Sequence, residues 1–345
     1  MAGLSPDRAL TLLFPLLRLS LWGTPLPDAV KQETRLLNES DWEVLISVAK
    51  NQSVTGLLFQ AVDSLPEDIE IPDKTLVQLA VMADRIEASY RRISTASEIV
   101  LTELRNEGLN PVVMKGLSCA SWYPRPELRQ SGDIDIYLPK LPTKSGRHFQ
   151  TSPDGSLHFQ QDGVDIDIHS RYFDIHHHTE YLPSVPSPEA EWMMISLHIL
   201  KHATTSGVGL RQICDAALLW KILPDNSKAS LPIIFKATHT MRWHLLLFSF
   251  LEDYFHIQNP LRHISSKPLL SIIAHGGNFG HHSTSRSRLL KAPSFIRKAD
   301  TAFRFLLRIP FSLRFAPREI LPTIKELTTG NLQHAFTADS HSILH

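Results

Sequence analysis

Two short segments of the chain alternate apolar residues with acidic ones, and these acids are the residues best suited to chemistry. Segment 133–138 reads Asp-Ile-Asp-Ile-Tyr-Leu, and segment 164–169 reads Val-Asp-Ile-Asp-Ile-His. Successive side chains of a strand point to opposite faces, so Asp133 and Asp135 share one face of the first strand. Carboxylates held side by side repel one another, and a divalent cation compensates for that repulsion. The pattern therefore favours a metal site.

The second segment places Asp165, Asp167 and His169 on one face in the same way. If the two strands pair in one sheet, the acids of both converge, and Asp133, Asp135 and Asp167 become candidate metal ligands and catalytic residues. Mg²⁺ takes oxygen ligands and is commonly held by a few carboxylates together with substrate phosphates. The alternative is that these acids only cover the solvent face of an amphipathic sheet, and Asp165 fits that alternative best.

A short turn, Lys115-Gly116-Leu117-Ser118, lies between these acids and a β-branched run at 111–114 that predicts a buried strand. Glycine permits close approach of the backbone to a ligand, and the N-terminus of a following helix binds phosphate groups. Lys115, Gly116 and Ser118 are therefore candidate nucleotide-binding residues. The alternative is an ordinary turn between a strand and a helix.

Two arginines are further candidates for binding a nucleotide. Arg129 lies four residues before Asp133, where it can orient the carboxylates or bind a triphosphate through two hydrogen bonds. An ordinary surface arginine is the alternative. Arg211 and Asp215 lie four residues apart in a predicted helix at 210–223, which is typical of a surface ion pair. A glycine-rich break before that helix leaves room for Arg211 to line a cleft instead.

The histidines and cysteines show no pattern that predicts a metal site or a catalytic nucleophile. His176–His178 are adjacent in a predicted loop and cannot all face one ion, so no zinc site is expected there. His198 and His202 lie on one face of a helix that begins near Ser187, and a structural or cleft-lining role is expected. The two cysteines show no pattern of a disulfide framework or a nucleophile, which favours a reducing cytoplasm.

Helical periodicity surrounds the acidic segments. The apolar stretch 10–22 is interrupted by proline and arginine and predicts a packed helix, without a signal-peptide cleavage site or the length to span a membrane. Ser40 and Glu43 have the spacing of a capping box and predict a helix start. A long helix is expected at about 74–107, and the segment 139–155 is expected to be loop.

Composition excludes some partners. The 345 residues are 43% hydrophobic and 20% charged with a formal net charge of zero, which is typical of a soluble globular protein. A neutral chain without an aromatic and basic stripe is not expected to bind long nucleic acid. The helical stretch after residue 296 is locally basic, which suggests a weak peripheral contact with a membrane.

In these motifs the chain resembles the bacterial proteins known as uncharacterised nucleotidyltransferases, of the DNA polymerase β-like superfamily. The resemblance covers roughly residues 35–335. It rests on Lys115-Gly116, Tyr123-Pro124, Arg129, Gly132-Asp133-Ile134-Asp135, Asp167-Ile168-His169, His198, Lys201-His202, Gly207-Val208-Gly209-Leu210-Arg211-Gln212, Asp215, Gly277-Asn278-Phe279-Gly280 and Ala316-Pro317.

The resemblance implies an α+β fold, with a small mixed sheet of nucleotidyltransferase type flanked by helices. The expected organisation is a helical region at 1–108, the core sheet at 109–180 and a second helical region at 181–345. Two departures stand out. Leu117 separates Gly116 from Ser118, where the superfamily has a direct Gly-Ser turn, and the segment 139–163 is short where a connecting helix and strand would normally lie.

The implied function is a Mg²⁺-dependent nucleotidyltransferase that uses two ions, with Asp133, Asp135 and Asp167 as the metal-binding carboxylates. It would transfer a nucleoside monophosphate from an NTP, ATP among them, to a small-molecule or protein acceptor that the sequence does not identify. The alternative is a nucleotide- or partner-binding protein that keeps the fold without turnover, and the shortened segment 139–163 motivates it.

Overall fold

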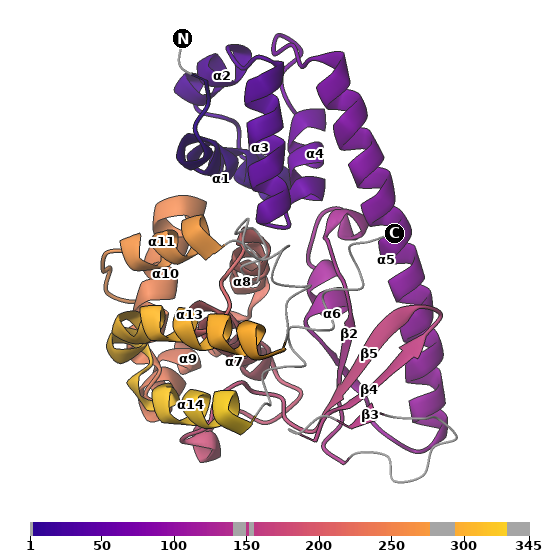
Figure 1. Ribbon diagram of the computed structural model, residues 1–345, viewed down its shortest axis with the longest axis vertical. Coiled ribbons are helices and arrows are strands. Elements are labelled where there is room, and N and C mark those ends of the chain that lie inside the picture. Colours follow the sequence, from indigo (N-terminus) through magenta and orange to yellow (C-terminus); the bar gives the residue numbers. More distant parts are fainter. Residues whose placement is uncertain (1–2, 141–149, 152–154, 277–293, 330–345) are drawn as a thin grey trace.

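The computed structural model describes residues 3–140, 150–151, 155–276 and 294–329. Helices come first along the chain, a five-stranded mixed sheet follows, and a second group of helices ends the described part (Figure 1). The predicted α+β class is therefore confirmed. The sheet lies between the long helix α5 (Asp73–Asn106) and the C-terminal helices (Figure 1).

The N-terminal helices begin and end where local chemistry favours it. They are α1 (Pro6–Trp22), α2 (Asp28–Arg35), α3 (Glu39–Asn51), α4 (Thr55–Asp63) and α5. In α1 the Ser5 side chain accepts the Arg8 amide, and Gly23 ends the helix with a φ of 67°. The predicted capping box at Ser40 is wrong by two residues, because Asn38 caps α3 and Asp41 returns a bond to the Asn38 amide.

The two acidic segments form neighbouring strands, as predicted. The strands are β1 (Val112–Met114), β2 (Ile134–Tyr137), β3 (Gln150–Thr151), β4 (Leu157–Gln161) and β5 (Val164–His169). Their order is β1-β2-β5-β4-β3, and β2 runs parallel to β5 while the other pairs are antiparallel. In that parallel pair Asp135 lies opposite Asp167. A one-residue shift of register would have placed the two acids on opposite faces.

One face of the sheet is covered by α5. The apolar residues of β2, β4 and β5 pack there against the C-terminal half of the helix; the buried residues are Ile93, Ala96, Val100, Leu104, Ile134, Ile136, Leu138, Leu157, Val164, Ile166 and Ile168. Because side chains alternate along a strand, burying this set sends Asp135 and Asp167 to the opposite face. That face lies toward the C-terminal helices (Figure 1).

The expectation of a loop at 139–155 is wrong in part. Residues 150–151 form β3, and β4 follows at 157–161 as an antiparallel partner of β5. Residues 141–149 and 152–154 lie outside the described residues. The segment 139–163, although short, therefore supplies two strands to the sheet.

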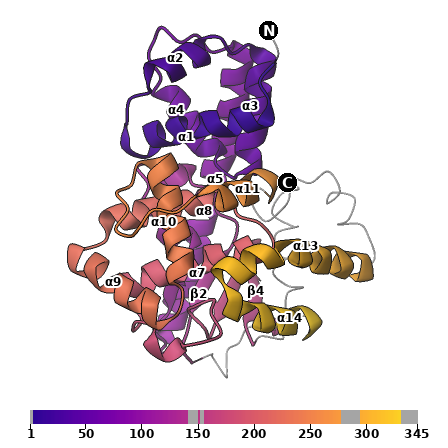
Figure 2. The ribbon, with the colours of Figure 1, turned by 90° about the vertical axis from the view of Figure 1, so that its left-hand side faces the viewer.

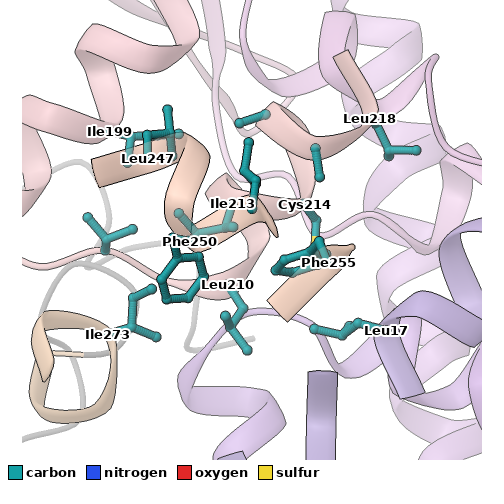
Figure 3. Packing of buried hydrophobic residues seen from close by; sticks show 14 of the residues in the cluster. Leu17, Ile199, Leu210, Ile213, Cys214, Leu218, Leu247, Phe250, Phe255 and Ile273 are labelled. Carbon is teal, nitrogen blue, oxygen red and sulfur yellow. The ribbon is translucent and has the colours of Figure 1, made fainter. Parts of the chain in front are cut away.

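The C-terminal helices share a core with the N-terminal ones. They are α7 (Pro188–Thr204), α8 (Leu210–Ile222), α9 (Asp225–Ala237), α10 (Met241–Phe255), α11 (Lys267–Gly276), α13 (Ser294–Phe315) and α14 (Ile320–Thr329). Leu17 of α1 packs in one cluster with Cys214 of α8 and Phe255 of α10 (Figure 3). Figure 2 shows α1 above α10 and α11 in the turned view. The predicted Gly277–Gly280 motif lies outside the described residues.

Candidate metal centre

The parallel pairing of β2 and β5 brings three metal-binding groups together. Asp135, Asp167 and His169 each offer a ligand atom, and these atoms lie within 4.8 Å of one another. His169 follows Asp167 by two residues on the same face of β5, so the alternation that places one places the other. Two carboxylates with an imidazole make a donor set that suits a divalent cation.

Asp135 is the most enclosed member of this group, with 7% of its surface exposed. Lys115 donates to Asp135 Oδ1 over 3.3 Å, and His169 Nε2 lies 2.8 Å from the same oxygen. On the next strand, His158 Nδ1 of β4 contacts Asp167 Oδ1. Each carboxylate thus has a basic side chain beside it.

The charges of Lys115 and Asp135 stabilise each other. Burial alone would raise the pKa of Asp135, but the Lys115 charge and the His169 hydrogen bond outweigh burial and hold that pKa well below its usual range. Burial would likewise lower the pKa of Lys115, but the charges of Asp135, Asp174 and Asp133 raise it above its usual value. Both groups are therefore charged at neutral pH, and the ammonium lies next to the candidate ligands.

Asp133 is not a member of this closely spaced group of donors among the described residues. It precedes β2, and among the described residues the group of closely spaced ligand atoms contains Asp135, Asp167 and His169 without it. Its charge still acts on Lys115. A Cβ atom on Gly116 would lie 3.3 Å from the Asp133 carbonyl oxygen, and Gly116 has a φ of 27°. Glycine therefore lets the predicted phosphate turn lie against the backbone of Asp133.

Side chains of α7 and of the loop before it face the same region. Asp174 Oδ1 accepts from Lys201 over 2.8 Å, and Asp174 Oδ2 lies 2.9 Å from His198 Nδ1. His198 Nε2 is 3.0 Å from His202 Nε2. Burial, together with the Lys115 charge, lowers the pKa of His198 to about 4 despite the neighbouring Asp174. His198 is therefore neutral at pH 7, whereas Asp174 and Lys115 are charged.

The remaining predicted nucleotide-binding residues have protein partners. Ser118 Oγ donates to Glu191 Oε1 over 3.1 Å, and burial raises the pKa of Glu191. Arg211 donates to the carbonyl of Gln130 over 2.6 Å, which ties α8 to the chain leading into β2. The predicted roles of Ser118 and Arg211 in binding nucleotide stay predictions.

Arg129 forms a buried ion pair that the sequence did not predict. Its Nε and one terminal nitrogen donate to Asp215 over 2.8 and 2.7 Å, and both side chains are at most 5% exposed. Tyr123 donates to the same carboxylate over 2.7 Å. The expected surface pair of Arg211 with Asp215 is therefore wrong, because Asp215 faces inward and binds Arg129. The predicted contact of Arg129 with a triphosphate stays a prediction.

Sequence reasoning missed three residues of the centre. His169 was placed on the acidic face but not counted as a ligand, and its position two residues after Asp167 was the available signal. His158 was missed because β4 was not expected. Asp174 carries no local signal at all, because a loop residue beside a histidine run reaches the centre only through the tertiary fold.

The histidine run contacts the chain around residue 319. His176 Nδ1 lies 2.7 Å from Glu319 Oε2, and His177 Nδ1 lies 2.6 Å from Glu319 Oε1. His178 contacts Arg318. The run therefore joins the loop before α7 to the short 3-10 helix at Pro317–Glu319.

Comparison with known protein families gives a match. The sequence model of a family described as uncharacterised nucleotidyltransferases matches residues 38–251, which is more than half of the 345-residue chain. The matched range contains Lys115, the strands β1 to β5 and Asp174. No curated protein and no solved structure matches the chain. Among the described residues, no helix combines the length and the apolar character needed to cross a membrane.

Proposed function

Because the chain belongs to this uncharacterised nucleotidyltransferase family, we propose that it is a Mg²⁺-dependent enzyme that transfers a nucleoside monophosphate from an NTP to an acceptor. An acceptor oxygen attacks the α-phosphorus of the NTP, the bond to the bridging oxygen breaks, and pyrophosphate leaves. The observation that carries the proposal is the pairing of Asp135 with Asp167 on the face of the sheet opposite α5.

The residues present fit a hard divalent cation. Asp135 and Asp167 supply carboxylate oxygens, and the charge of Asp133 acts on Lys115, which also pairs with Asp135. We propose these three carboxylates as the ligands of two Mg²⁺ ions. When bound, such ions stabilise the attacking and leaving oxygens of an in-line displacement. His169 is placed to hold Asp135 in position, because its Nε2 already lies 2.8 Å from that carboxylate.

Lys115 and the Gly116 turn are proposed to bind the phosphates of the NTP. The ammonium of Lys115 is charged, enclosed and adjacent to the carboxylates, so it can bind a phosphate oxygen close to bound metal. Ser118, Arg129 and Arg211 complete the predicted nucleotide-binding set. Small-molecule and protein acceptors both remain within the proposal, and ATP is one of the NTPs to test.

The decisive assay is pyrophosphate release with Mg²⁺ and each NTP in turn, on the parent and on Asp135→Asn and Asp167→Asn. Asp165→Asn is the matched control, since Asp165 lies on β5 two residues from Asp167 but bonds Gln160 over 2.8 Å, outside the donor group. We expect the first two variants to lose turnover and Mn²⁺ binding, and the control to keep both. Equal loss in all three variants would contradict the proposed site.

The same experiment separates an enzyme from a binding protein. A protein that only binds nucleotide would melt at a higher temperature with NTP and Mg²⁺ but release no pyrophosphate from any NTP. The acceptor is unidentified, so the assay without added acceptor relies on water in its place. We expect slow basal release of pyrophosphate from the parent under these conditions and none from the Asp135→Asn variant. The non-catalytic alternative would be favoured if the parent binds nucleotide but releases no pyrophosphate with any of a range of added hydroxyl acceptors.

A further inference from the structure

Helix α13 exposes an apolar stripe along one side. Phe303, Leu306, Leu307, Pro310 and Leu313 recur at intervals of three and four residues, which places them on one face of the helix. The exposed fractions of Phe303, Leu306, Leu307 and Leu313 are 59%, 58%, 66% and 57%. Single exposed leucines are common on protein surfaces, but a continuous stripe along one helix marks an interaction surface.

The opposite side of α13 fixes the helix on the body of the protein. Phe305 and Phe315 are 4% and 3% exposed, and Ser312 is 1% exposed. Arg308 donates to the carbonyls of His202 and Ala203 over 3.0 and 3.2 Å, at the end of α7. The exposed stripe is therefore additional to the apolar side by which α13 packs on the protein. The helix already buries one side and still presents a second apolar one.

The neighbouring helix also exposes apolar residues. α14 lies beside α13 in both views (Figures 1 and 2), and it exposes Leu321 by 77% and Ile324 by 40%. Arg314, Arg318 and Lys325 are exposed among these apolar residues. We call the set of Phe303, Leu306, Leu307, Leu313, Arg314, Arg318, Leu321, Ile324 and Lys325 the C-terminal face.

The exposed charges of this face are cationic. The charged members of the C-terminal face are Arg314, Arg318 and Lys325, and Glu319, the acid that lies between Phe303 and Lys325 in the sequence, is buried. A cationic and apolar helix face suits a lipid surface with anionic headgroups, because the cations bind the headgroups while the apolar side chains enter the hydrocarbon boundary. A second copy of the chain is a poorer occupant, since a two-fold contact would bring the arginines of one copy against those of the other.

We propose that the C-terminal face binds the surface of an anionic lipid bilayer, with α13 lying in the plane of the headgroups. Leu306, Leu307 and Phe303 enter the acyl boundary, and Arg314 contacts lipid phosphates. The helix does not span the bilayer, in agreement with the absence of a spanning helix among the described residues. This surface lies on the outer side of α13 and is independent of the proposed nucleotidyl transfer.

The test is sedimentation of the full chain with vesicles of phosphatidylcholine alone and of phosphatidylcholine mixed with phosphatidylglycerol. We expect the parent to bind the mixed vesicles and to leave them as salt is raised. Leu306→Ser with Leu307→Ser should weaken binding at least about tenfold, because two exposed leucines lose their transfer into lipid. Arg314→Gln should weaken it about fivefold. The matched control is Ile233→Ser on α9. Ile233 is 72% exposed and lies far from α13 in sequence, so this variant should bind the vesicles as the parent does.

Three results would overturn the proposal. The first is no sedimentation of the parent with the mixed vesicles, and the second is equal sedimentation with neutral and mixed vesicles. The third is a dimer in light scattering that dissociates in the Leu306→Ser, Leu307→Ser variant, because that result assigns the face to a second copy. Melting curves of all variants accompany the assay, and a brominated lipid that quenches a Leu307→Trp variant provides a second measure of insertion.

Discussion

Asp135 is stabilised as an anion by the residues around it. Lys115 and His169 both reach its Oδ1, and its pKa is held well below the usual aspartate range. Sequence reasoning that considers only the repulsion among Asp133, Asp135 and Asp167 leads to the opposite expectation, namely that neutralising Asp135 relieves strain. The Lys115 charge and the His169 hydrogen bond decide the balance. Lys115 directly follows β1, and His169 ends β5.

Asp135→Asn is therefore predicted to abolish nucleotidyl transfer and also to destabilise the protein in the absence of metal. Loss of an anionic ligand should cost about 3–5 kcal/mol of transition-state stabilisation, roughly a hundredfold to a few thousandfold in rate. The folded-state pKa of Asp135 is depressed, so the stabilising charge is present above the unfolded-state pKa and lost as pH falls below it. At neutral pH the variant should lose about 1–3 kcal/mol of unfolding free energy.

Pyrophosphate release and urea unfolding, both measured on parent and variant at pH 7, check these two effects. A second unfolding series below pH 3 provides the control, since the stability difference between the two proteins should shrink there. A variant that turns over NTP like the parent would show that Asp135 is not a ligand. A variant more stable than the parent in the absence of metal would show that carboxylate repulsion dominates after all.

Most helices and strands could be predicted from two sequence patterns, the alternation of apolar and polar residues in strands and the helical periodicity of apolar residues. The strands β2 and β5, helix α5 and helix α1 could be predicted, because each has a strong pattern of buried positions in a continuous stretch. The strands β3 and β4 could not, since Leu157–Gln161 is short, partly polar and preceded by turn residues. The predicted N-cap of α3 was wrong because Asn38 and Ser40 are both good N-cap residues, and only the structure shows which one is used.

Gly56 shows a packing constraint that no sequence pattern reveals. It lies within α4, where alanine would normally stabilise the helix by about 0.5–1 kcal/mol. A Cβ atom there would lie 2.1 Å from the carbonyl oxygen of Leu128, in the 3-10 helix at Pro126–Leu128. Gly56→Ala is therefore predicted to destabilise the protein by about 1–3 kcal/mol, because backbone must move to admit the methyl group.

Thermal and urea unfolding of Gly56→Ala measure this cost. Gly3→Ala is the matched control, since the nearest atom to its added methyl group is a side-chain oxygen of Asp41 at an ordinary 3.6 Å. The control should unfold within about 0.5 kcal/mol of the parent. If Gly56→Ala is as stable as Gly3→Ala, α4 does not approach the 3-10 helix as closely as the structure places it.

His244 of α10 gives the helical core a dependence on pH. It is fully buried, stacks on Phe235 with ring centroids 3.5 Å apart, and its Nδ1 lies 3.0 Å from the carbonyl oxygen of Thr240. Burial lowers the pKa of His244 to about 3. The unfolded chain takes up this proton near pH 6.5 and the folded chain does not. Stability from this group is therefore complete above pH 6.5 and falls as pH drops toward 3, by up to about 1.4 kcal/mol per pH unit.

The prediction is that His244→Gln flattens the fall in unfolding free energy between pH 6.5 and 4.5, although the variant is less stable at pH 7. Urea unfolding at several pH values measures the slope. The control is Ile233→Ser, because Ile233 is 72% exposed and carries no titratable group, so this substitution should leave the slope unchanged. Parallel curves for parent and His244→Gln would mean that His244 is protonated in the folded protein.

Across the whole molecule, segments far apart in sequence share one core. Phe14 of α1 contacts Phe250, Tyr254 and Phe255 of α10, and Arg18 donates to the carbonyl of Tyr254 over 2.6 Å. The division of the chain at 108 and 180 stays a prediction, and the apolar cluster that joins α1 to α10 means that the first and last regions stabilise each other. Sequence periodicity identifies the buried face of each helix but not the helix it packs against.

Arg129 and Asp215 connect the sheet to the C-terminal helices. Arg129 follows the 3-10 helix that leads into β2, and Asp215 lies on α8, 86 residues later in the chain. Burial would lower the pKa of Arg129, but Asp215 outweighs it and raises that pKa above its usual value, so the guanidinium is charged. Removing one partner leaves the other charge buried without compensation, which typically costs about 3–5 kcal/mol.

Arg129→Met and Asp215→Asn should each lose about that much unfolding free energy, and the double variant should lose at least about 2 kcal/mol less than the sum of the two. Urea unfolding followed by tryptophan fluorescence gives this double-mutant cycle. Additivity of the two losses within about 0.5 kcal/mol would contradict a direct pair.

The affinity for NTP adds a separate measure of the role of Arg129. If Arg129 only positions the sheet, Arg129→Met and Asp215→Asn should weaken NTP binding equally. If the guanidinium also binds the triphosphate, Arg129→Met should weaken it at least about tenfold more, since a charge-assisted contact worth 1.4 kcal/mol or more is then lost in that variant alone.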